Sequence, residues 1–183
     1  MLELKYIDNT VIEVNTIYDY YIPVIIKFKK NDGNSNIKDY MKEDIFYLEI
    51  KDNAEKESLI EIGIGKKTNT ISKIVVTSVY GVKFNESKIK FKNTVEGWPV
   101  LDTSKFSFEK EMYSMMYVEK IQTYLSNGRM EIVLNDIKRP LNEIKITDKF
   151  EIGVNDRLQI VYFVVKKITQ NEYELLLESL QKP

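Results

Sequence analysis

Short apolar segments with every second residue polar recur along most of the chain. Between residues 24 and 29, Ile26 and Phe28 alternate with Lys27 and Lys29, which is the period-two pattern of a strand with one solvated face. Further strands are predicted at residues 2–14, interrupted by the turn pair Asp8-Asn9, and at residues 45–50. Residues 31–36 have only turn-forming side chains and are predicted to be a loop.

Three pairs of apolar segments lie close enough in sequence to form hairpins. The pairs are residues 58–65 with 71–80, 118–125 with 130–134, and 150–154 with 158–165. Asn127 and Gly128 connect the second pair, and both tolerate the positive φ of a tight turn. The sequence therefore predicts mainly antiparallel pairing, with at least eight strands.

Two segments have features of helices. Thr169 and Glu172 have the spacing of a capping box, and leucines follow at helical spacing, so a helix is predicted over about 170–181. Its packing positions are predicted to be Leu176, Leu177 and Leu180. Residues 104–117 are ambiguous, because their methionines and acidic start favour a helix whereas their tyrosines and phenylalanines favour a strand. We expect the helix.

One short motif occurs twice. Glu61-Ile-Gly-Ile and Glu151-Ile-Gly-Val each end a predicted strand and are each followed by a polar turn and an isoleucine-rich strand. The separation is close to half of the chain. Either the match is a coincidence, or the chain is an ancient duplication with halves 1–95 and 96–183, for which Gly97-Trp-Pro-Val is the candidate boundary. In both cases we expect one domain over residues 1–183.

Composition supports a sheet-rich fold. There are 23 Ile, 15 Val and 12 Tyr but a single Ala, and β-branched and aromatic side chains favour strands whereas Ala favours helices. The predicted fold class is α+β, mainly antiparallel β, with a C-terminal helix and one further helix at 104–117.

Charge and residue types exclude several functions. The 27 basic and 28 acidic residues give a net charge of −1, which is not the cationic field expected of a protein that binds nucleic acid or an anionic membrane. The chain contains neither Cys nor His, so disulfides, Cys/His zinc sites and histidine-containing catalytic triads are excluded. No export signal or apolar run of membrane-spanning length is recognisable. We expect a cytoplasmic protein without a nucleic-acid or membrane partner.

Candidate catalytic motifs are weak. Gly63-Ile-Gly-Lys-Lys-Thr lacks the spacing of a phosphate-binding loop, and the adjacent carboxylates Glu43 and Asp44 look like ordinary exposed charge. The lysine clusters fit the solvated faces of strands better than a nucleic-acid groove. We therefore expect no enzymatic activity, no metal and no cofactor.

Aromatic residues with acidic neighbours are the candidates for binding a protein partner. Trp98, held between Gly97 and Pro99, is either a core residue or an exposed anchor, and the tyrosines near residue 20 have the same two interpretations. The predicted partner-binding residues are Glu96, Trp98, Asp102, Tyr18, Tyr20 and Tyr21. We favour residues 96–102, because flanking Gly and Pro restrain the tryptophan and the two carboxylates can attract a basic partner.

Residues 59–65 with 74–77, residues 150–160 and residues 169–177 together resemble small immunity-like proteins of low-GC Gram-positive bacteria. Some of those proteins are encoded beside polymorphic or contact-dependent toxins. The resemblance implies a non-enzymatic cytoplasmic protein that binds and neutralises a cognate toxin domain. The alternative is a regulatory or structural accessory domain. The oligomeric state is left open by the sequence.

Overall fold

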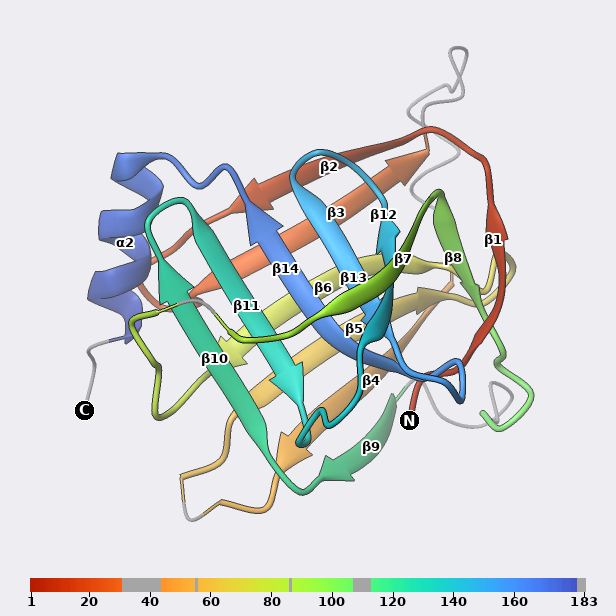
Figure 1. Cartoon of the computed structure of the whole chain (residues 1–183), viewed down its shortest axis with the longest axis horizontal. Helices are drawn as coiled ribbons and strands as arrows, with labels where there is room; N and C mark the ends of the chain where they lie inside the picture. The colour runs from red at the N-terminus through yellow and green to blue at the C-terminus, as the bar shows by residue number, and fades with distance from the viewer. Residues whose placement is uncertain (31–43, 55, 86, 107–112, 181–183) are drawn as a thin grey trace.

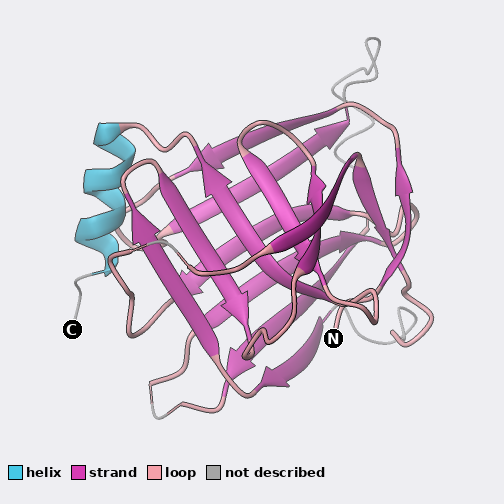
Figure 2. Cartoon of the chain, viewed as in Figure 1, coloured by secondary structure: helices cyan, strands magenta, loops and turns pink. Residues whose placement is uncertain are grey.

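The computed structural model describes residues 1–30, 44–54, 56–85, 87–106 and 113–180 (Figure 1). The strands are β1 (Leu4–Asp8), β2 (Ile12–Ile17), β3 (Val24–Lys30), β4 (Ile45–Asp52), β5 (Leu59–Gly65), β6 (Ile71–Ser78), β7 (Phe91–Glu96), β8 (Trp98–Leu101), β9 (Tyr113–Val118), β10 (Ile121–Ser126), β11 (Arg129–Leu134), β12 (Leu141–Lys145), β13 (Phe150–Val154) and β14 (Ile160–Lys166). One helix, α2 (Gln170–Leu180), follows the last strand. The fold is sheet-rich with a C-terminal helix, as predicted (Figure 2).

Two six-stranded sheets pack face to face with their strands crossing (Figure 1). The first sheet has the order β2-β3-β6-β5-β4-β9, and the second has the order β10-β11-β14-β13-β12-β7. A separate antiparallel pair joins β1 to β8. Helix α2 lies at one end of the two sheets, and the β1–β8 pair lies at the other.

The two sheets repeat one arrangement. In each, a two-stranded hairpin (β2–β3 or β10–β11) lies beside an antiparallel three-stranded unit (β4–β5–β6 or β12–β13–β14). The strand at the far edge of that unit, β9 or β7, pairs with it in parallel. The β5–β6 and β13–β14 pairs even share a register irregularity, after Gly63 and after Gly153 respectively. These glycines belong to the duplicated motif seen in the sequence, which is therefore placed at equivalent points of the two sheets. Descent from a duplication stays a prediction.

The two chain segments that build most of each sheet, β2–β6 and β10–β14, are the repeated units, and they exchange their edge strands. Strand β7 follows the first unit but pairs with β12 of the second sheet, and β9 precedes the second unit but pairs with β4 of the first sheet. The β1–β8 pair bridges the two units in the same reciprocal way, because the Leu4 N–H donates to Leu158 O at 2.7 Å and the Leu101 N–H donates to Asn69 O at 2.8 Å. One apolar cluster runs through both sheets, so the repeats share a single core.

The outer faces of the sheets differ. In β4, buried and partly exposed residues alternate, as expected for a strand with one solvated face. All residues of β13 and nearly all of β14 are buried instead. The cause is the chain that leads into β7: residues 87–91 cross the outer face of the second sheet (Figure 1), and Ile89 and Phe91 pack on a second apolar cluster there.

The three predicted hairpins and the C-terminal helix are confirmed. The helix expected over 104–117 is wrong at its C-terminal end, where residues 113–118 form β9. Parallel pairing with β4 supplies the backbone hydrogen bonds that a helix would otherwise have provided. Residues 107–112, like the predicted loop at 31–36, lie outside the described residues.

Candidate functional site

Trp98 lies in the core. This residue is 8% exposed and belongs to the apolar cluster between the sheets. Trp98 is the first residue of β8, which pairs with β1. Gly97 has a φ of 144°, and a Cβ there would lie 2.4 Å from Ile7 Cγ2, so the chain closes tightly on β1 at this point. Of the two interpretations of Trp98, the core one is correct. The expectation that this ring is an exposed anchor is wrong.

The two carboxylates expected beside Trp98 are accessible but already engaged. Glu96 is exposed and accepts a hydrogen bond from Lys145 Nζ at 3.0 Å, at the rim of a hollow of about 510 Å³. Asp102 accepts the Ser104 N–H at 3.0 Å. The hydrogen bonds that Ser104 donates to Asp102, together with the charges of nearby lysines, lower the pKa of Asp102. Without an exposed aromatic ring between them, these charges do not form the expected anchor site.

The three tyrosines divide between core and surface. Tyr18 packs against the core, and burial raises its pKa to about 12. Tyr20 and Tyr21 are 49% and 80% exposed, with ring centroids 5.2 Å apart in an edge-on arrangement. Asp19 shapes their loop by accepting the Tyr21 N–H at 2.8 Å. Two of the predicted tyrosines therefore present rings to solvent.

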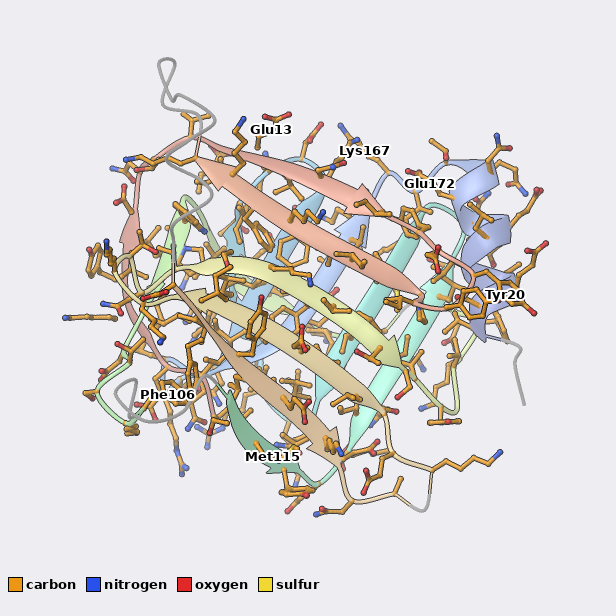
Figure 3. The ribbon with its side chains drawn as sticks, turned by 180° about the vertical axis from the view of Figure 1, so that it is seen from behind. Glu13, Tyr20, Phe106, Met115, Lys167 and Glu172 are labelled. Carbon is orange, nitrogen blue, oxygen red and sulfur yellow. The ribbon has the colours of Figure 1, made fainter. Side chains whose placement is uncertain are left out.

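The six predicted residues do not form one site. The loop that carries the tyrosines lies beside α2, whereas the C-terminal end of β7 and strand β8 lie toward the opposite end of the molecule (Figure 1). Figure 3 shows Tyr20 next to the helix, on the same side as Glu172. Glu172 is also close enough to Tyr18 to contribute to the raised pKa of its phenol.

Helix α2 adds carboxylates to the tyrosine loop. The capping box forms as predicted, with Glu172 Oε2 accepting the Thr169 N–H at 2.7 Å. Leu176 and Ser179 face the core, which leaves the opposite side of the helix exposed. We define the tyrosine–helix surface as Asp19, Tyr20, Tyr21, Glu174, Leu175 and Glu178. It combines exposed rings with three carboxylates.

A buried polar cluster lies on the outer face of the second sheet. Glu131 is 1% exposed and accepts hydrogen bonds from Arg129 Nε at 3.0 Å, from the Tyr162 hydroxyl at 2.8 Å, and from the N–H and hydroxyl of Ser87. Burial and the neighbouring Glu131 raise the pKa of Tyr162. Glu131 holds Ser87 and its crossing segment, and Arg129 and Tyr162 in turn hold Glu131, so we assign the cluster to the packing of this segment.

A second buried carboxylate lies on the same face. Glu151 forms an ion pair with Lys166, and burial raises the pKa of Glu151 above its usual range. The pair covers the sheet between β13 and β14 and lines neither the hollow beside Glu96 nor the cavity described next. We assign it to packing as well.

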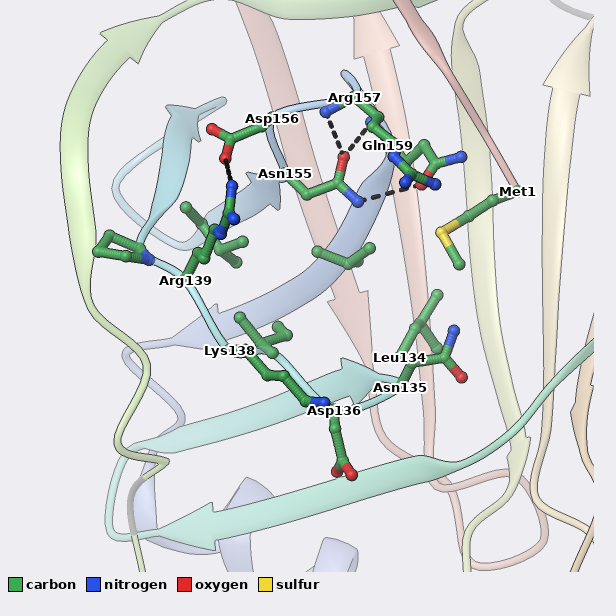
Figure 4. Close-up of a pocket in the computed structure, with 14 residues that line it drawn as sticks. Met1, Leu134, Asn135, Asp136, Lys138, Arg139, Asn155, Asp156, Arg157 and Gln159 are labelled. Carbon is green, nitrogen blue, oxygen red and sulfur yellow. Dashed lines mark hydrogen bonds and ion pairs between the residues drawn. The ribbon is translucent and has the colours of Figure 1, made fainter.

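A cavity of about 420 Å³, which the sequence alone did not reveal, lies on the second sheet (Figure 4). Its walls are the β11–β12 connection and the β13–β14 turn, and its rim carries Lys138, Arg139 and Arg157. Leu134, Leu141 and Val161 are buried beneath it. A signal was present in the sequence: only 3 of the 27 basic residues are arginine, and two of them are here.

Among the described residues, no cluster of three or more acidic side chains is placed to hold a metal ion. No helix of the described chain has the length and apolar character needed to cross a membrane. Comparison with models of protein families found no match, and comparison with curated proteins found none either.

Proposed function

We propose that the chain is a non-enzymatic cytoplasmic protein that binds one protein partner, a toxin domain with a basic surface, and blocks it. The observation that carries the proposal is the tyrosine–helix surface. Tyr20 and Tyr21 expose adjacent rings there, and tyrosine is among the residue types that dominate the binding energy of protein interfaces. The toxin itself is inferred from the resemblance to immunity-like proteins.

The chemistry of this surface favours a basic partner. Asp19 lies in the same loop as the rings, and Glu174 and Glu178 are exposed on the helix beside that loop (Figure 3), so opposite charges on a partner would accelerate association. The helix is fixed by its capping box and by Leu176 in the core, so little ordering entropy would be lost when it is covered. A stable complex would need about 800 Å² from this chain, so we expect the helix to take part together with the loop.

The test is co-expression with the product of the neighbouring gene. We expect that product to be toxic alone and harmless together with this chain. The double variant Tyr20→Ala/Tyr21→Ala should weaken the complex at least about 30-fold, as expected when hot-spot rings are removed, and should abolish protection. Its melting temperature should stay close to that of the unmodified protein, because both rings are outside the core.

Tyr117→Ala is the matched control, since Tyr117 is 61% exposed but lies on the edge strand β9. It should retain both complex and protection. If the neighbouring product is not toxic or no complex forms, the toxin assignment is wrong, and the alternative of an accessory domain is favoured. If the complex forms but tolerates the double tyrosine variant, the surface is wrong while the function stands.

A further inference from the structure

The arginines of this chain are not distributed like its other basic residues. Lysine supplies 24 of the 27 cations, so arginine stands out wherever it is used. Arg129 donates from Nε to Glu131 and from Nη2 to the Tyr162 hydroxyl, so its guanidinium is engaged inside the buried cluster. The other two, Arg139 and Arg157, both line the 420 Å³ cavity. A guanidinium holds carboxylate and phosphate oxygens in pairs, which an ammonium does not do.

The cavity has the size and lining of a ligand site. Its volume lies within the range of small-molecule pockets, about 300–1,000 Å³. The arginines come from different walls, since Arg139 belongs to the β11–β12 connection and Arg157 to the β13–β14 turn (Figure 4). Below them the floor is apolar and buried, formed by Leu134, Leu141 and Val161. A ligand that fits must therefore carry an anionic group and an apolar part.

The wall that carries Arg157 is rigid before any ligand arrives. Asn155 Oδ1 accepts the N–H groups of Arg157 at 2.9 Å and of Gln159 at 3.0 Å, and Asn155 Nδ2 donates to Gln159 Oε1 at 3.1 Å. Leu158 adopts a φ of 59°, which is costly for a bulky side chain. The equivalent turn of the first sheet has Asn69 at this place, with a φ of 56°, and asparagine tolerates that conformation readily.

Asp156 is the one carboxylate of the rim that contacts an arginine. It pairs with Lys92 and, at 3.6 Å, with Arg139 Nη1. Lys92 already compensates the charge of Asp156. Asp136 is the other carboxylate of the lining, so the three basic side chains Lys138, Arg139 and Arg157 still leave the cavity a surplus of positive charge. Removing the Asp156 carboxylate should therefore free Arg139 to bind a ligand. A substitution of Asp156 is expected to strengthen ligand binding, whereas substitutions of the arginines are expected to weaken it.

We propose that this cavity binds a small amphipathic anion, a carboxylate or phosphate monoester on a short apolar chain, with Arg139 and Arg157 holding the anionic group and the leucine–valine floor taking the apolar part. The assignment is independent of the tyrosine–helix surface. It requires no partner protein and makes no claim of catalysis.

The test titrates the full chain, labelled on Leu and Val methyl groups for NMR, with hexanoate, hexyl phosphate, hexanol and inorganic phosphate. Hexanoate or hexyl phosphate should shift the methyls of Leu134, Leu141 and Val161 with saturation in the millimolar range, as expected for a ligand of about eight to eleven heavy atoms. The two anions distinguish a carboxylate from a phosphate source. Hexanol and inorganic phosphate should bind at least tenfold more weakly, because each lacks one half of the recognised chemistry.

Three substitutions test the roles of the rim. Arg139→Gln and Arg157→Gln should each weaken binding about tenfold, the loss expected for a charge-assisted hydrogen bond. Asp156→Asn should tighten binding about two- to fivefold. Lys67→Gln, on the equivalent turn of the first sheet, is the matched control and should change nothing.

Each contrary result overturns the proposal. Absence of saturable shifts with both anions up to 50 mM (roughly tenfold above the expected range) would show that the cavity is unused. Equal binding of hexanol would show that the arginines do not select charge, and equal binding of inorganic phosphate would show that the floor adds nothing. Insensitivity to both arginine substitutions in variants that keep the methyl spectrum of the folded protein would place the anion elsewhere.

Discussion

At the scale of single residues, Trp98 shows how an aromatic side chain can anchor a strand pair. Its ring packs in the shared core, and its Nε1 has no hydrogen-bond partner within the described part of the chain. An unpartnered indole N–H costs free energy, so the ring contributes to stability through apolar contact. Trp98 therefore behaves as a large hydrophobic residue at the point where β8 meets β1.

Trp98→Ala should lower the free energy of unfolding by about 3–5 kcal/mol, the cost of deleting a buried large aromatic side chain. Trp98→Phe should cost much less, about 1.5 kcal/mol or below, because it keeps an apolar ring and removes the unpartnered donor. Chemical denaturation followed by circular dichroism measures both. Phe84→Ala is the control, since Phe84 is 64% exposed, and it should have little effect. A near-neutral Trp98→Ala would show that the ring is not part of the core.

The burial of single residues could be predicted only where the local pattern decides it. Ile26 and Phe28 are buried and Lys27 and Lys29 exposed, as their alternation indicates. Trp98 has no such pattern, because its burial depends on β1, which is some 90 residues away in the chain. The arginine cavity was missed for the same reason, since Arg139 and Arg157 come from separate connections that only the fold brings together.

At the scale of elements, the sequence predicts what neighbours in the chain decide. The hairpins β5–β6, β10–β11 and β13–β14 were found because two apolar strands and a turn lie within one short segment. Strand β9 was predicted as part of a helix, and of β7 only the lysine cluster around Lys92 was interpreted as the solvated face of a strand. Both strands pair in parallel with distant partners. In addition, β7 exposes all its residues except Phe91, so no buried face marks it in the sequence.

Helix α2 offers a matched pair of adjacent leucines. Leu176 is fully buried against the sheets, and Leu175 is 41% exposed. Leu176→Ala should lower the free energy of unfolding by about 2–5 kcal/mol, whereas Leu175→Ala should change it by about 0.5 kcal/mol or less. Because both substitutions replace leucine with the best helix former, their difference in thermal or chemical denaturation reports packing alone. Equal effects would mean that the helix is peripheral to the core.

At the scale of the whole molecule, the exchange of β7 and β9 makes the repeated units interdependent. Each sheet has an edge strand that comes from the other half of the chain, and the β1–β8 pair hydrogen-bonds to the turns of both sheets. The proposed halves 1–95 and 96–183 consequently do not correspond to two separate packing units. An apolar cluster common to both sheets predicts that they unfold together.

Two equivalent isoleucines test this cooperativity. Ile62 in β5 and Ile152 in β13 are both fully buried and precede the duplicated glycines, one in each sheet. Ile62→Ala and Ile152→Ala should each lower the free energy of unfolding by about 2–5 kcal/mol. In both variants, Trp98 fluorescence and far-ultraviolet circular dichroism should give one coincident transition. If the halves were independent, Ile62→Ala would split the dichroism transition in two and leave one half at its original midpoint, because only the substituted sheet would lose its packing.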